Sequence, residues 1–170
     1  MPHLNTRMPT GDDVTQRSGS TPAFSDDLFE HVLRWDNLHA AWKRVRANKG
    51  AAGIDGMSID KFPDWARNGH WKRVVSELET GRYRPSPVRR VEIDKPDGGI
   101  RQLGIPTVID RVIQQAIAQV LTPIFDPGFS NNSFGFRPGR NGQQAVKQVQ
   151  SIIKEGRRIA VDVDLSKFFD

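Results

Sequence analysis

Residues 88–105 read VRRVEIDKPDGGIRQLGI, and this stretch decides the class of fold. VRRVEID and IRQLGI are predicted strands. The PDGG between them is a strong turn signal, because glycine adopts the positive φ angles of tight turns without strain. The sequence therefore predicts an antiparallel hairpin with Lys95 and Arg101 flanking its tip. Such cations can hold a triphosphate; the alternative is a solvated hairpin with ordinary surface charges.

Helices are predicted on both sides of the hairpin from apolar residues at helical spacing. The first begins at an N-cap, Ser25, and its apolar stripe, which runs to Val45, is expected to pack in a core. A short helix capped by Ser58 follows, and then a helix that ends at Gly81. Two longer helices are expected over residues 108–125 and 142–155, capped by Thr107 and Asn141. Helices and a hairpin together indicate an α+β fold.

Composition narrows the kinds of partner. The chain has 170 residues and a formal net charge of +5, with an isoelectric point of about 9.9, which favours a polyanionic partner. Residues 131–158 hold six basic residues and one acid. The absence of cysteine excludes disulfides and thiolate metal sites. Without a long apolar run we expect no membrane partner and a cytoplasmic location, and residues 1–24 have the composition of a disordered tail.

Two loops carry candidate binding residues. Residues 48–56 are glycine-rich and include Lys49, but they lack the Gly-Lys-Ser/Thr ending of a phosphate-binding loop, so a simple connector is the favoured interpretation. Residues 133–140 read SFGFRPGR. Aromatic rings alternating with arginines suit stacking bases and phosphates. The alternative places two phenylalanines in the core and leaves the two arginines merely exposed.

The C-terminal motif of the sequence is an expected strand at 158–165. Ile159, Val161, Val163 and Leu165 alternate with small or acidic residues, which predicts a buried strand. An acid on such a strand is costly unless it is paired or binds a metal. Asp164 is the best candidate metal ligand because the strand gives way to polar residues there. A two-metal site needs several carboxylates from more than one segment.

Seven motifs occur in an order that resembles bacterial group II intron reverse transcriptase/maturases over about residues 25–170. They are residues 48–56, RYRPSP at 82–87, KPDGGIR at 95–101, LGIPT at 103–107, DRVIQ at 110–114, SFGFRPGR at 133–140 and residues 164–170.

The resemblance implies the fingers of a right-hand polymerase with the first palm strand, an incomplete palm and no thumb. The implied regions are a disordered tail at 1–24, a helical N-terminal extension at 25–81, fingers at 82–157 and a truncated palm strand at 158–170.

It also implies a role for each matching residue in a protein whose partners are template and intron RNA, a DNA primer and a deoxynucleoside triphosphate. Asp164 would be the catalytic aspartate that holds two Mg²⁺ ions together with the Leu165 carbonyl, and Phe169 would lie under the incoming sugar. Lys95 and Arg101 would contact the triphosphate. The residues implied to contact RNA or template are Lys49, Phe134, Phe136, Arg137 and Arg140.

The family's second catalytic motif, Tyr-Ala-Asp-Asp, does not occur in these 170 residues. We therefore expect this polypeptide alone to be an inactive fragment, unless a separate polypeptide supplies the missing palm. Two alternatives stay open. One is a non-catalytic RNA-binding, maturase-like module or a degenerate remnant. The other is a diversity-generating or CRISPR-associated relative with the same polymerase core.

Overall fold

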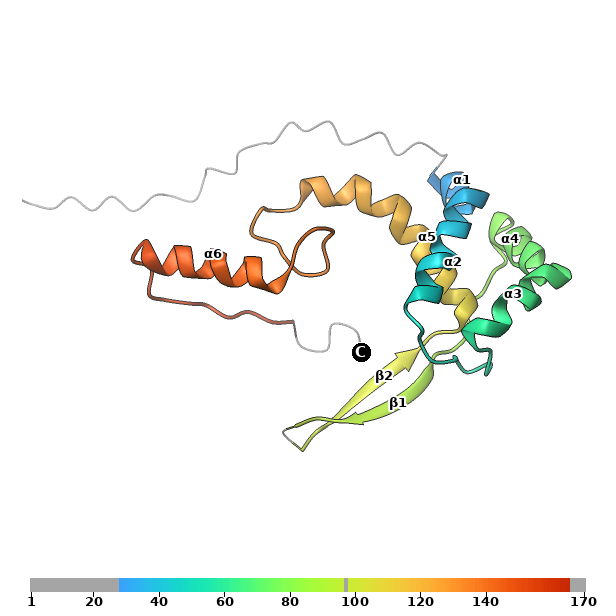
Figure 1. Ribbon diagram of the computed structural model, residues 1–170, viewed down its shortest axis with the longest axis horizontal. Coiled ribbons are helices and arrows are strands. Elements are labelled where there is room, and N and C mark those ends of the chain that lie inside the picture. Colours follow the sequence, from blue (N-terminus) through green and yellow to red (C-terminus); the bar gives the residue numbers. More distant parts are fainter. Residues whose placement is uncertain (1–27, 97, 166–170) are drawn as a thin grey trace, which may run out of the picture.

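The computed structural model describes residues 28–96 and 98–165. In this part, a two-stranded hairpin projects from a helical body, and the last helix lies apart from that body (Figure 1). Helices and strands together confirm the α+β class. The elements are α1 (Leu28–Leu33), α2 (Trp35–Ala47), η1 (Ile59–Lys61), α3 (Phe62–Trp65), η2 (Ala66–His70), α4 (Trp71–Glu79), β1 (Arg89–Asp94), β2 (Ile100–Ile105), α5 (Val108–Phe125), η3 (Asp126–Gly128) and α6 (Gly142–Lys154).

The first predicted helix is in fact two helices, because the helical backbone is interrupted at Arg34. This residue is extended, with φ −55° and ψ 138°, and its guanidinium donates to the carboxylate of Asp36 at 3.1 and 3.2 Å. The side-chain amide of Asn37 donates to the Val32 carbonyl at 2.9 Å, which satisfies an acceptor near the end of α1. The prediction of one continuous helix was wrong here, and its expected cap, Ser25, lies outside the described residues.

The core lies where α2 packs against α5. Asn37 also joins these helices, since its amide donates to the Ala116 carbonyl at 3.1 Å and its Oδ1 accepts from Gln119 at 2.7 Å. This confirms the predicted core role of most of the first apolar stripe; the exception is Trp35, which is 72% exposed. The buried apolar residues of the cluster are Val32, Leu38, Ala41, Val45, Ile59, Phe62, Val108, Val112 and Ala116.

The hairpin is confirmed. β1 pairs with β2 in antiparallel register, with Arg89 opposite Ile105 and Asp94 opposite Ile100. The Lys95 N–H donates to the Gly99 carbonyl at 2.7 Å and closes the turn, while Gly98 takes a φ of 84° that favours glycine.

The caps of the two long helices are confirmed as well. The Thr107 side chain accepts from the Asp110 N–H at the start of α5. At the start of α6, Asn141 and Gln144 form a reciprocal capping box. These signals are local in sequence, which is why they could be predicted.

The strand predicted at 158–165 is wrong. Residues 157–165 form neither helix nor strand, and the Ile159 side chain is 91% exposed. The physical reason is the lack of a partner, since the described sheet contains only β1 and β2 and a lone strand leaves its backbone groups unpaired. The apolar stripe of α6 is half exposed beside it, at Val146, Val149 and Ile153. No described helix is long and apolar enough to cross a membrane.

Candidate nucleic-acid interface

Arg137 is the centre around which the loop 126–140 is folded. Its side chain is only 9% exposed. Its Nε and Nη2 donate to the Asp126 carboxylate at 2.7 and 3.3 Å, and Nη2 also donates to the Asp126 carbonyl at 2.9 Å. Its Nη1 donates to the carbonyls of Ser130 and Ser133 at 2.8 and 3.1 Å. A guanidinium has five N–H donors, so every one is used within the loop.

This arrangement also sets the electrostatics of the loop. Hydrogen bonds from Arg137 lower the pKa of the Asp126 carboxyl, and the same bonds raise the pKa of Arg137. The guanidinium also lies 5.3 Å from the ring centre of Phe129. The template contact implied for Arg137 stays a prediction, and such a contact would have to displace one of these bonds.

The loop presents one bare aromatic ring. Phe136 is fully exposed and has a φ of 55°. A left-handed backbone costs a residue with a side chain about 1 kcal/mol, so the surrounding loop must hold it there. The alternative that placed both phenylalanines in the core is wrong, since Phe136 is exposed and Phe134 is only partly buried.

Arg140 completes a cationic and aromatic surface. Its guanidinium lies 5.4 Å from the ring centre of Phe134 and donates to the Asn131 carbonyl at 3.1 Å. A polar hollow of about 540 Å³ lies between this part of the loop and α6, and its lining includes two cations and no acid. Phosphate oxygens suit such a lining. The lining residues are Asn131, Asn132, Phe134, Arg140, Gln144, Lys147 and Gln148.

The glycine-rich loop at 48–56 is fastened to the hairpin and to α5. Arg111 donates to the Ala51 carbonyl at 2.8 Å, and Arg89 donates to the Ala52 carbonyl at 3.0 Å. A Cβ at Gly53 would lie 2.6 Å from the Thr107 Cα, so only glycine fits this approach. The geometry supports the connector interpretation. Lys49 is exposed on this loop, and its implied contact with RNA stays a prediction.

Asp110 is a buried carboxylate. The sequence predicted the helix cap at Thr107 but not the contacts that Asp110 makes with the segment before β1. Asp110 accepts from the Thr107 hydroxyl at 2.6 Å, the Tyr83 hydroxyl at 2.7 Å and the Ser86 N–H at 3.3 Å. These bonds fasten the segment before β1 to the start of α5. Burial and the neighbouring carboxylate raise the pKa of Tyr83.

The residues predicted to hold nucleotide and metal are not brought together. Lys95 and Arg101 are exposed near the hairpin tip. Asp164 is exposed, and its carboxylate accepts the Leu165 N–H at 2.9 Å. Over residues 28–96 and 98–165, no group of three or more His, Asp or Glu could hold a metal ion. One carboxylate does not make a Mg²⁺ site, so the described residues alone do not fit the two expected Mg²⁺ ions. Phe169 lies outside the described residues.

Comparison with known proteins assigns the family. Residues 93–170 match the family model for reverse transcriptase (RNA-dependent DNA polymerase). Group II intron-encoded protein LtrA of Lactococcus lactis is 36% identical over 151 residues, which cover 84% of this chain and 24% of LtrA. Together these matches support a group II intron reverse transcriptase/maturase as the family of this chain.

Two further relatives agree with this assignment. Protein YkfC of Escherichia coli is also 36% identical, over 84% of this chain and 39% of YkfC. A putative COX1/OXI3 intron 1 protein of Saccharomyces cerevisiae is 31% identical over 86% of this chain and 17% of its own length. This chain therefore spans well under half the length of these relatives.

The candidate interface contains residues that sequence reasoning did not assign. Lys147 and Gln148 face the polar hollow from α6, and helical spacing from the Asn141 cap could have placed them beside the loop. Asp126 carries no comparable signal, because its partner Arg137 is 11 positions away along an irregular loop.

Proposed function

We propose that this chain supplies the N-terminal extension and the fingers of an RNA-directed DNA polymerase encoded by a group II intron. In this proposal α1 to α4 belong to the extension at 25–81, and the hairpin, α5, the loop 126–140 and α6 belong to the fingers at 82–157. Residues 158–170 would begin the palm. The family assignment and the similarity to LtrA over most of the chain support this division.

The proposed RNA-binding surface is the loop 126–140 with the adjacent face of α6. Phe136 stacks on an unpaired base and Arg140 meets a phosphate, as exposed rings and guanidinium groups do in single-strand binding. Arg137 acts as a positioning residue, because all five of its N–H donors bind the loop itself. This closed set of bonds is the observation that carries the proposal. It explains how a fully exposed ring is held in a strained conformation.

The nucleotide would meet the hairpin. Lys95 and Arg101 can neutralise a triphosphate from the exposed tip. Asp164 would supply one carboxylate, and Leu165 a carbonyl, to a Mg²⁺ site whose other ligands are not among the described residues. Phe169 would lie beneath the sugar. RNA binding by the loop requires none of these groups, so a non-catalytic RNA-binding module is the second candidate function.

Binding of fluorescein-labelled single-stranded RNA, followed by anisotropy over a range of salt concentrations, tests the RNA-binding surface. We expect Phe136→Ala to weaken binding about fivefold or more, the low end of the contribution of one stacked base. Arg140→Ala should also reduce the dependence of binding on salt. Phe29→Ala is the matched control, since Phe29 is an exposed phenylalanine on α1. Equal losses at Phe136 and Phe29, or none at either, would remove the loop from the interface.

A further inference from the structure

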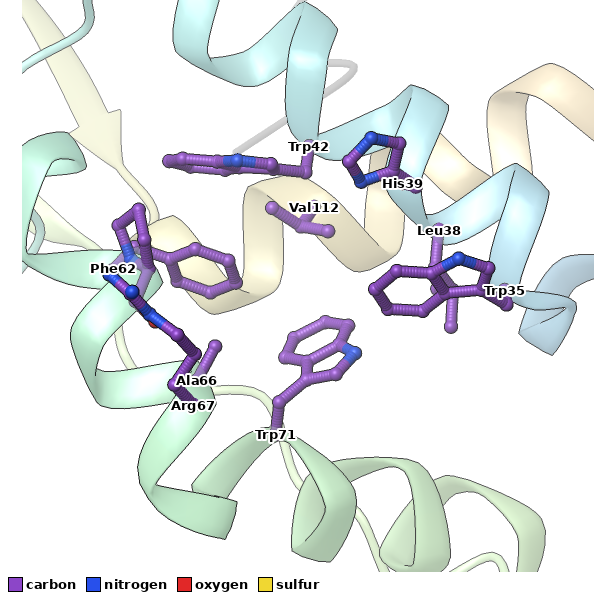
Figure 2. Close-up of a pocket in the computed structure, with 10 residues that line it drawn as sticks. Trp35, Leu38, His39, Trp42, Phe62, Ala66, Arg67, Trp71 and Val112 are labelled. Atoms are coloured by element: carbon purple, nitrogen blue, oxygen red, sulfur yellow. The ribbon is translucent and has the colours of Figure 1, made fainter.

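A pocket of about 280 Å³ opens between α2, α3 and α4, outside the proposed RNA-binding loop. Figure 2 shows the rings of Trp35, Trp42, Phe62 and Trp71 around an open centre, with Val112 behind them. Trp42 and Phe62 are tilted at a centre distance of 4.5 Å, and Phe62 meets Trp71 edge-on at 5.5 Å. The pocket is therefore walled by flat, apolar surfaces.

One wall is too exposed to be ordinary core. Trp35 is 72% exposed, and its ring stacks on His39 alone among the described residues, at 5.5 Å. The indole N–H groups of Trp35, Trp42 and Trp71 have no acceptor in the described ranges. None of these three groups is buried. They remain free to donate to a ligand. An indole that combines a bare ring face with a free donor suits a ligand that is both flat and polar at its edge.

The charges around the pocket select the kind of ligand. Its lining includes Arg67 and His39 and contains no acid. Arg67 is paired with Asp64 at 2.5 Å, but both side chains are more than 70% exposed, so the pair can exchange with solvent. Next along α2, Lys43 and Arg46 form no ion pair with a described residue. The lining therefore offers positive charge to a phosphate backbone and no carboxylate to a bound cation.

We propose that this pocket binds an unstacked base of single-stranded RNA, held between Trp35 and the facing rings, with the flanking phosphates near Lys43 and Arg67. A pocket of about 280 Å³ is just below the range for drug-sized ligands, which suits one flat ring system. The inference rests on the proposed function for the identity of its partner, and it adds a second contact distant in sequence from the loop 126–140.

Tryptophan fluorescence of the 170-residue chain reads this pocket directly, because three of its four tryptophans line it. We expect single-stranded oligoadenylate to quench the emission and Trp35→Ala to weaken its binding about fivefold, with Trp35→Phe recovering most of the affinity. An exposed position allows Trp35→Ala to leave the fold intact, which circular dichroism checks. Ile54→Ala, which alters another exposed apolar residue, should bind like the parent chain.

The outcomes separate this inference from the proposed function. If Phe136→Ala weakens binding while Trp35→Ala does not and the emission stays constant, the pocket is not a base site and the proposed interface survives. If neither variant changes binding, both fail. If the emission instead changes with protein concentration, and sedimentation shows a dimer that Trp35→Ala dissociates, the pocket is a contact between copies and the inference is overturned.

Discussion

Replacing Asp110 should loosen the joint between the helical body and the hairpin. This carboxylate accepts from the Thr107 hydroxyl, the Tyr83 hydroxyl and the Ser86 N–H, at 2.6 to 3.3 Å, and it is only 4% exposed. A hydrogen bond to a charged group contributes about 1.5–3 kcal/mol. The contributions of the three bonds are not simply summed. Tyr83 is only partly buried, so in the variant its hydroxyl can bond to water instead. We therefore expect Asp110→Ala to lower the free energy of unfolding by about 3 kcal/mol.

Two variants separate the carboxylate from its shape. Asp110→Asn keeps the size and one acceptor oxygen, so we expect a loss of about 1–2 kcal/mol. Tyr83→Phe removes only the 2.7 Å bond and should cost about 1 kcal/mol. In the double variant with Asp110→Ala the two losses should not add, because the same bond is removed twice.

Urea unfolding followed by circular dichroism measures each loss. Asp60→Ala is the matched control, since Asp60 is an exposed acid in the first turn of η1 and should change stability by no more than about 0.5 kcal/mol. If Asp110→Ala unfolds at the same urea concentration as Asp60→Ala, the carboxylate does not fasten the segment before β1 to α5. Full additivity with Tyr83→Phe would equally refute the proposed bond.

Three further results are expected. Arg137→Lys keeps the charge but loses the planar five-donor fork, so it should speed proteolysis within 126–140 and weaken RNA binding as Phe136→Ala does; unchanged cleavage would mean that the loop does not depend on the fork. Because its folded-state pKa is raised, Tyr83 stabilises the fold fully below about pH 10. That contribution is lost as the pH rises towards the raised pKa, so the parent chain should lose more stability than Tyr83→Phe between pH 9 and 11, and parallel curves would contradict this. Gly53→Ala should destabilise by about 1–3 kcal/mol because its Cβ would meet backbone at Thr107, whereas Gly128→Ala has open space and should not; equal urea midpoints would rule out that close approach.

The parts of the fold that could be predicted from sequence are those whose signals are local. The hairpin follows from the glycines of its turn, and α5 and α6 begin at Thr107 and Asn141, whose caps bond within three residues. The break at Arg34 was missed because an unbroken apolar stripe passes through it. Nothing in that periodicity shows that the Asn37 amide takes the Val32 carbonyl.

The missed features of the candidate site depend on distant partners. The stretch 159–165 has the alternation of a strand, yet a strand exists only where another strand pairs with it, and none does among the described residues. The SFGFRPGR motif could be recognised as a mixture of rings and cations. In the structure Arg137 turns inward and Phe136 turns outward. This arrangement depends on Asp126 and on two backbone carbonyls that no spacing rule selects.

Photocrosslinking tests whether the loop 126–140 contacts RNA. A benzophenone side chain is placed at position 136 in the 170-residue chain, and the same substitution at position 29 is the matched control. We expect a crosslink to labelled single-stranded RNA at position 136 that unlabelled RNA competes away, and little at position 29. Equal crosslinking at the two positions, or none at position 136 under conditions where the RNA is bound, would contradict it.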